Sequence, residues 1–134
     1  MPARTHLALA LVLTLSAAVG APAVAHHAFA TYYLEQDTIE VEGRILEFQY
    51  KNPHSWIHVE GEERSRQGVR IYAAEWVGTS RLEREGINGR TLRAGDSVRV
   101  WAAPNRNPSD NRIHLKRILR SDGWQWGSNR RETR

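Results

Sequence analysis

A strict alternation of apolar and polar residues is the feature that most constrains how this chain can fold. After position 38 the apolar residues Ile39, Val41 and Ile45 fall on one face of an extended segment, and charged residues fall on the other. A repeat of two residues is typical of a β-strand with one buried face, because successive side chains of a strand point to opposite sides. The same alternation returns in several later segments that are bounded by glycine or proline. The chain therefore predicts a domain built mainly of β-strands.

The first predicted strand begins at Thr38 and is stopped by Asn52-Pro53, because proline cannot donate a hydrogen bond to a strand ladder. Within this strand the apolar phase slips at Ile45-Leu46, which predicts a β-bulge. Further strands are predicted over 54–60, 69–76, 97–103 and 112–120, with a polar hairpin loop over 61–68.

The third predicted strand also alternates, with Val69, Ile71 and Ala73 on the face that we expect to be buried. A short helix over residues 79–85 follows it, for which Thr79 or Ser80 can provide the cap and Gly86 the end.

Three strands, a short helix and two more strands, with a long bent first strand, is the order of an OB barrel. The predicted fold class is therefore all-β, a small five-stranded OB-like barrel with one short helix between strands 3 and 4. A fragment of a β-sandwich is the alternative.

The first 25 residues are interpreted as a secretory signal. Arg4 precedes an apolar stretch over residues 7–19, which has the length found in signal peptides and is too short to cross a bilayer. Ala23-Val24-Ala25 has small residues where signal peptidase reads the chain, and Ala21-Pro22-Ala23 is a competing site. Cleavage after Ala25 predicts a periplasmic or secreted protein that begins at His26 and has no stable membrane insertion.

The chain that remains after cleavage, about 110 residues, is enough for one domain with a single core. We expect four parts along the precursor: a signal peptide over 1–25, an N-terminal segment over 26–37, an OB-like β-barrel domain over 38–120 and a polar C-terminal tail over 121–134.

Composition excludes several kinds of site. The chain has no cysteine, which rules out disulfides, thiolate metal sites and cysteine nucleophiles. Its 19 lysine and arginine residues are interleaved with 15 acidic residues and form no single basic stripe, so we expect no nucleic-acid partner.

Histidine is the residue type best suited to bind a metal in such a chain. A free N-terminal His26 offers its α-amine and its ring Nδ1 to one ion, and one further imidazole completes a T-shaped Cu(II) site. His27, His54 or His114 can supply that imidazole, and His54 is the first choice because proline places it at a bend. His54 and His58 lie roughly 13 Å apart in a regular strand and cannot share an ion. The predicted metal residues are His26, His27 and His54, for one copper ion.

A second group of candidates surrounds the second and third strands. Its members are aromatic or polar and form a predicted ligand-binding surface: Asn52, His54, Trp56, His58, Tyr72, Glu75 and Trp76. Aromatic rings can stack on a ligand, although rings in strands more often pack across their neighbours. Glu75 follows the apolar face of the third strand, so we expect it to point inward near one barrel end and to make a structural hydrogen bond with an arginine or a tryptophan.

The motifs also occur together in a known family. In chain order they are Ala25-His26-His27 with Phe29, Val41-Glu42-Gly43-Arg44-Ile45, Asn52-Pro53-His54, Glu75-Trp76, Leu82-x-x-x-Gly86, Gly95-Asp96-x-Val98-x-Val100 and Asp122-Gly123. In this order the chain resembles, over nearly all of its mature length, the small exported bacterial proteins called domain of unknown function 6152. The resemblance implies export and a compact β-fold but no established activity. Ala28 departs from it, because a small polar residue is expected there.

Two function classes follow from these observations. The first is an exported, non-catalytic β-barrel binding module whose ligand, a small molecule or an envelope protein, is unknown. The alternative is a periplasmic copper-binding protein that uses the mature N-terminal histidine. A hydrolase ranks below both, because the sequence contains no nucleophile motif and no phosphate-binding loop.

Overall fold

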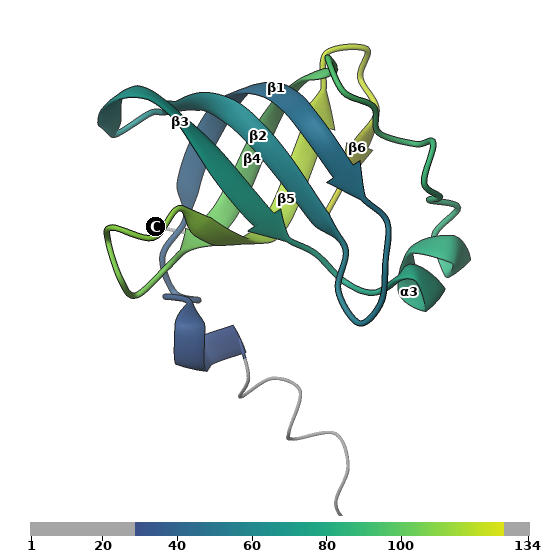
Figure 1. Ribbon diagram of the computed structural model, residues 1–134, viewed down its shortest axis with the longest axis horizontal. Coiled ribbons are helices and arrows are strands. Elements are labelled where there is room, and N and C mark those ends of the chain that lie inside the picture. Colours follow the sequence, from purple (N-terminus) through teal and green to yellow (C-terminus); the bar gives the residue numbers. More distant parts are fainter. Residues whose placement is uncertain (1–28, 128–134) are drawn as a thin grey trace, which may run out of the picture.

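The computed structural model describes residues 29–127 (Figure 1). Its elements are the strands β1 (Ile39–Gln49), β2 (Trp56–Glu63) and β3 (Arg66–Glu75), the helix α3 (Thr79–Arg84), and the strands β4 (Ser97–Pro104), β5 (Arg112–Arg120) and β6 (Gln125–Trp126). No helix within residues 29–127 is long and apolar enough to cross a membrane.

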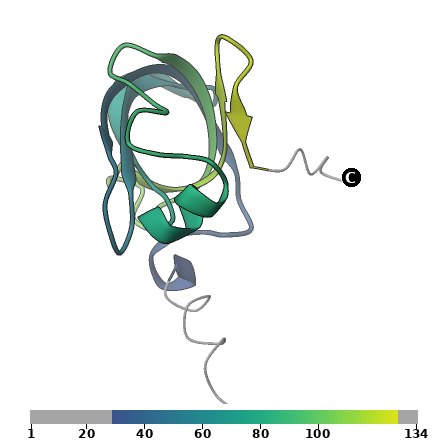
Figure 2. The same ribbon diagram turned by 90° about the vertical axis from the view of Figure 1, so that its right-hand side faces the viewer.

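The strands close into a barrel, as the sequence predicts. The sheet order is β3-β2-β1-β4-β5-β6 with antiparallel neighbours, and a parallel pairing of β3 with β5 joins the two sides. Figure 2 shows the closed ring, with β6 lying outside it and α3 close to one end. The prediction of a five-stranded barrel with one short helix between strands 3 and 4 is therefore confirmed. The two-residue strand β6 was not expected.

The bulge in β1 is confirmed at the predicted place. The register of β1 against β2 shifts between Ile45 and Glu47, so that Glu47 lies opposite His58. Leu46 is the extra residue and is 42% exposed. The bulge bends the long strand, which pairs with β4 before the bulge and with β2 on both sides of it.

The inward faces of the strands form one apolar core. Its largest fully buried side chains include Trp76, Tyr72, Ile45, Ile57 and Leu82. Two glycines lie opposite each other in the pairing of β1 with β2: a Cβ atom on Gly43 would lie 2.1 Å from the Glu60 carbonyl oxygen, and one on Gly61 2.4 Å from that of Glu42. Only residues without a side chain fit there.

The prediction of which residues of the third strand face the core is wrong. Val69 and Ile71 are 65% and 53% exposed, whereas Tyr72 and Ala74 are buried. The pairing explains the phase, because Tyr72 and Ala74 lie opposite the inward residues of β2. Apolar side chains occupy both faces of this strand. Alternation alone could not tell which face is buried, and the prediction took the outer face.

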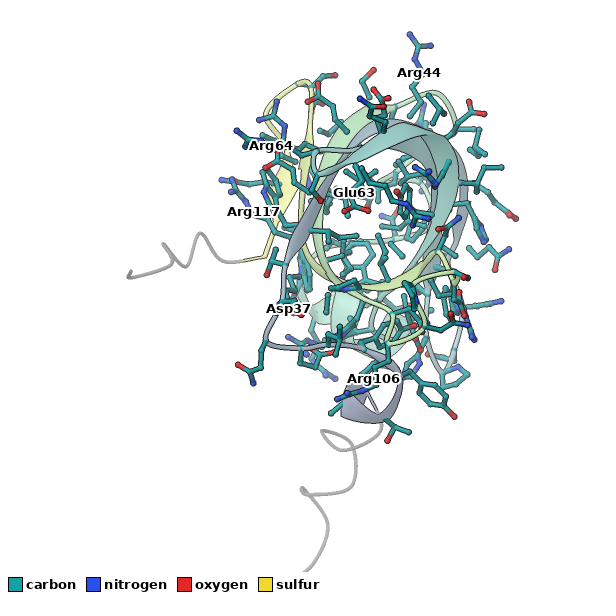
Figure 3. The ribbon with its side chains drawn as sticks, turned by 90° about the vertical axis from the view of Figure 1, so that its left-hand side faces the viewer. Asp37, Arg44, Glu63, Arg64, Arg106 and Arg117 are labelled. Atoms are coloured by element: carbon teal, nitrogen blue, oxygen red, sulfur yellow. The ribbon has the colours of Figure 1, made fainter. Side chains whose placement is uncertain are left out.

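The predicted hairpin loop over residues 61–68 is also wrong. Both strands continue into it, and only residues 64 and 65 form the turn between β2 and β3. Glu63, on the inward face, remains half-buried and accepts a hydrogen bond from the Tyr72 hydroxyl at 3.4 Å. Figure 3 shows Glu63 inside the ring of strands and Arg64 outside it. The polar residues of this hairpin therefore belong to strands at a polar end of the barrel and not to a loop.

The helix is confirmed, but its cap is not. α3 begins after Gly78 and has no side-chain cap from Thr79 or Ser80. Instead, the Asn52 side-chain oxygen accepts the Thr79 backbone N–H at 3.0 Å. Gly86 follows the helix with a φ of 76°, which glycine adopts without strain.

Candidate functional site

A segment before the first strand crosses the seam where β3 meets β5. Residues 29–32 form a helical turn, and the chain then runs alongside the loop after β4. Leu34 donates its backbone N–H to the Pro104 carbonyl at 2.9 Å, and Arg106 donates its own to the Tyr32 carbonyl at 2.9 Å. Figure 3 shows Arg106 beside this turn, where its Nε donates to the Ala30 carbonyl at 2.8 Å. We call residues 29–37 the docked segment.

Lys116 on β5 fixes the end of the docked segment. Its ammonium group donates to the carbonyl oxygens of Glu35 at 2.9 Å and Asp37 at 2.7 Å, and to the Thr38 hydroxyl at 2.9 Å. One cation thus satisfies three acceptors in the last residues before β1, which holds the segment against the barrel.

Glu75 joins the docked segment to the barrel. One carboxylate oxygen lies 2.5 Å from Nδ1 of His54, and the other accepts a hydrogen bond from the Tyr33 hydroxyl at 2.5 Å. The side chain of Glu75 is only 13% exposed. The prediction that Glu75 points into the barrel is wrong, because its neighbours Ala74 and Trp76 occupy the inward face. Glu75 lies on the outer face and is covered by the docked segment, and its partners are Tyr33 and His54 rather than an arginine or a tryptophan.

Tyr33 is the buried anchor of the docked segment, with 2% of its surface exposed. Burial raises the pKa of the Tyr33 hydroxyl well above its ordinary value, and the hydrogen bond to the Glu75 carboxylate raises it further. Tyr33 therefore stays protonated and acts as a donor to Glu75 throughout the physiological pH range.

The loop that carries His54 is held on several sides. Its Asn52–Pro53 peptide bond is cis. Ser55 is fully buried, donates its N–H to the Val77 carbonyl at 3.1 Å and accepts the Trp76 N–H at 2.8 Å. Gly78 lies against this loop, where a Cβ atom would lie 2.5 Å from the Pro53 carbonyl oxygen. The His54 side chain, 38% exposed, thus extends from a fixed backbone.

His114 is the second oriented imidazole of this region. Its Nδ1 lies 2.8 Å from a carboxylate oxygen of Glu35 in the docked segment. The phenyl ring of Phe29 stacks on His114, with 4.1 Å between ring centroids and 5° between planes, and its centroid is 5.1 Å from that of His54. His114 and His54 therefore contact the same phenyl ring.

His58 faces a different glutamate. Its Nδ1 lies 3.4 Å from a carboxylate oxygen of Glu47, which the bulge places opposite it, but the pair lacks hydrogen-bond geometry. The three histidines of the described chain thus contact three separate carboxylates, and His54 and His58 do not share one.

The predicted aromatic surface does not form. Tyr72 and Trp76 are buried in the core, with 2% and 1% of their surface exposed, while Trp56 and His58 lie half-buried on the outer face of β2. Trp76 packs on Trp126 with ring centroids 4.9 Å apart, which holds β6 against the barrel. The candidate residues around the second and third strands therefore divide between the interior and the outside of the barrel.

Two of the predicted metal residues, His26 and His27, lie outside the described residues, as does the predicted signal peptide. Within residues 29–127, no three side chains of histidine, aspartate or glutamate come together as a metal-ligand set. His54 is the predicted metal residue that the structure describes, and its ring contacts Phe29, as that of His114 does.

Sequence reasoning missed Phe29, Tyr33 and Glu35 as parts of this site. Tyr33 is 42 residues from Glu75, and Glu35 is 79 residues from His114. Neither pair belongs to a strand pattern, because the docked segment precedes β1 and forms only an isolated bridge to Asn105. The sequence feature that could have indicated this part of the site was Phe29, which lies shortly after His26 and His27.

No curated protein and no solved structure matches the chain significantly. One family model matches residues 14–114, which include the docked segment, His54, Glu75 and His114. The match covers most of the chain and confirms the resemblance drawn from the motifs, so the protein belongs to the family of unknown function DUF6152.

Proposed function

We propose that this protein is an exported, non-catalytic β-barrel binding module whose ligand is one Cu(II) ion, held by the mature N-terminus at His26 and by the imidazole of His54. Copper binding was the alternative function suggested by the sequence, and the surroundings of His54 favour it over an aromatic ligand surface, since Tyr72 and Trp76 are buried.

The observation that carries the proposal is the contact between Glu75 and Nδ1 of His54 at 2.5 Å. Histidines that ligate metals almost always bind a carboxylate or a carbonyl through the other ring nitrogen, which fixes the tautomer and raises the basicity of the ligand. With Nδ1 held by Glu75, Nε2 is the nitrogen left for an ion. Tyr33 binds the second oxygen of the same carboxylate and restricts its rotation.

Only a short stretch of chain separates a mature start at His26 from Phe29. Phe29 contacts His54, and the chain between Phe29 and His26 has only three residue steps. Such a length spans at most about 11 Å. The α-amine and ring of a free His26 form a chelate of two nitrogens, and imidazole-rich nitrogen sites favour Cu(II) over harder cations.

A histidine beside a glutamate is also found in hydrolases, where the pair activates a nucleophile. That chemistry requires a hydroxyl or thiol at the ring nitrogen opposite the carboxylate. The chain has no cysteine and none of the serine nucleophile motifs. Binding therefore explains the pair of His54 and Glu75 without a nucleophile, which a hydrolase would require.

Calorimetric titration of Cu(II) into protein purified from the periplasm tests the proposal, with intact mass used to verify that the chain begins at His26. We expect one equivalent of tight binding. A variant with one additional residue before His26 should bind at least about tenfold more weakly, because it lacks the chelate of amine and ring. Equal affinity of both proteins, or no binding to the native one, would contradict the proposal and leave a metal-free binding module.

A further inference from the structure

We propose that the protein has a second ligand site, for a small aromatic molecule, at the place that the side chain of Trp126 occupies at the α3 end of the barrel. The ligand is a planar ring that carries one hydrogen-bond donor and one acceptor, and it displaces the Trp126 ring. The proposal does not depend on copper binding, because none of the residues that form this place belongs to the surroundings of His54.

Two groups hold the Trp126 ring. It packs in a T-shaped arrangement on Trp76, with 4.9 Å between ring centroids and 69° between planes. Its indole N–H donates to one carboxylate oxygen of Glu85, the residue that follows α3. The other oxygen of Glu85 accepts a hydrogen bond from Nε of Arg81 at 3.2 Å, which restricts rotation of the carboxylate. Trp76 and Glu85 therefore recognise an aromatic ring with a donor at its edge, and we call this pair the indole seat.

Trp126 leaves one group of the indole seat without a partner. Trp76 is 1% exposed, and its Nε1 has no hydrogen-bond partner among residues 29–127. An indole N–H is a donor only, so the ring nitrogen of Trp126 cannot accept a hydrogen bond from Trp76. A buried donor without an acceptor is unfavourable, because it has lost its hydrogen bonds to water. A ring that carries an acceptor in addition to its donor can satisfy both Trp76 and Glu85, which Trp126 does not.

The backbone attachment of Trp126 is short. β6 has two residues, pairs with β5 at two positions and lies outside the ring of strands (Figure 2). Gln125 adds a side-chain contact, from Arg117 at 3.1 Å, and the turn over residues 121–123 is exposed. A short exposed segment with few buried contacts opens locally at a lower free energy than a packed core does. β6 can therefore leave the indole seat while the barrel stays folded.

The indole N–H resonances of the ¹⁵N-labelled protein test the proposal in titrations with two rings of similar shape. Benzimidazole has a ring N–H donor and a ring-nitrogen acceptor, whereas indole has the donor alone. We expect benzimidazole to give saturable shifts of the Trp76 and Trp126 signals and to bind at least about tenfold more tightly than indole, because only benzimidazole can accept from Trp76. The signal of Trp101, whose N–H donates to Glu40 at 3.1 Å, should stay in place.

Two results of this titration would overturn the proposal. One is a Trp76 signal that does not move with benzimidazole, and the other is an equal shift of all five tryptophan signals, which indicates unspecific association. Equal affinity for benzimidazole and indole would show that Trp76 does not bind the acceptor, and it would overturn the assigned ligand class.

Variants of the two C-terminal tryptophans provide the matched measurement. Trp126→Ala should bind benzimidazole at least about tenfold more tightly than wild type, since no side chain has to be displaced. Trp126→Phe, which keeps a buried ring but cannot donate to Glu85, should also bind more tightly and is measured in case the alanine variant does not fold. Trp124→Ala is the control, because the ring of Trp124 lies under the Arg120 guanidinium, 5.4 Å from its centroid, and this variant should bind as wild type does. Wild-type affinity in the Trp126 variants, or an equal gain in Trp124→Ala, would contradict the proposal.

Discussion

Glu75 connects two parts of the molecule through its two carboxylate oxygens. One oxygen receives the Tyr33 hydroxyl from the docked segment, and the other holds the ring of His54 from the loop after β1. Hydrogen bonds to an ionised carboxylate are about twice as strong as those between neutral groups. The orientation of His54 is therefore linked to the docking of the segment that leads from the N-terminus.

Replacing Tyr33 by phenylalanine tests this link. The variant keeps the buried ring but loses a hydrogen bond to a charged group, so we expect a loss of about 1.5–3 kcal/mol in the free energy of unfolding, measured by urea denaturation. A change below about 0.5 kcal/mol would show that the Tyr33 hydroxyl contributes little to holding the segment.

The same variant should differ from wild type in its response to alkaline pH. The pKa of Tyr33 is raised in the folded protein by burial and by Glu75, whereas in the unfolded chain it titrates near its ordinary value of about 10. Above that pH the unfolded state loses a proton that the folded state keeps, so the stabilisation is present below pH 10 and declines as pH rises. The stability difference between wild type and Tyr33→Phe should therefore shrink above pH 10. A constant difference would contradict the assigned contact.

At the residue scale, sequence reasoning selected His54 because Pro53 places it at a bend, and the structure gives that ring a carboxylate partner. The roles of Tyr33 and Glu35 were not predictable, because their partners are distant in sequence and the docked segment has no strand periodicity. The inward direction predicted for Glu75 was wrong for a related reason: it relied on the phase of β3, which the apolar outer residues Val69 and Ile71 disguise.

Among the elements, the loop between β1 and β2 and the start of α3 depend on each other. Gly78 lets the two approach, and Asn52 supplies the acceptor for the first helical N–H. The sequence predicted the bend at Pro53 and the helix after it, but not their contact, because loop packing leaves no periodic signal. The predicted strands over 97–103 and 112–120 agree with β4 and β5, since both begin with alternating residues and are bounded by clear turns, although a register shift at Lys116 interrupts the alternation in β5.

Substituting alanine for Gly78 should disturb this contact. The new Cβ atom would lie 2.5 Å from the Pro53 carbonyl oxygen and 2.8 Å from the Asn52 side-chain oxygen. Overpacking of this kind costs about 1–3 kcal/mol, measurable by urea denaturation, and should displace the loop that carries His54. Gly89→Ala is the control, because its Cβ atom would meet Tyr50 at an ordinary 3.5 Å. Equal stability of the two variants would contradict the account of the loop.

For the molecule as a whole, the barrel closes where the candidate site lies. β3 and β5 pair in parallel over only three residue positions, 73–75 with 112–114, and the docked segment crosses this seam. The order of strands and helix along the chain was predictable from alternation and turns, but β4 pairs with β1 and not with β3, the strand that precedes it in the sequence. The closing pair was expected only from the OB pattern, and β6 was missed because its two residues are too few to show a period.

We propose that the carboxylate-oriented imidazole of His54 binds copper together with the mature N-terminus. Calorimetric titration of Cu(II) into His54→Ala and His58→Ala, both beginning at His26, tests it most directly, because both substitutions remove a histidine that faces a glutamate. We expect His54→Ala to bind at least about tenfold more weakly than wild type and His58→Ala to bind equally well. Wild-type affinity in His54→Ala, or an equal loss in both variants, would contradict the claim.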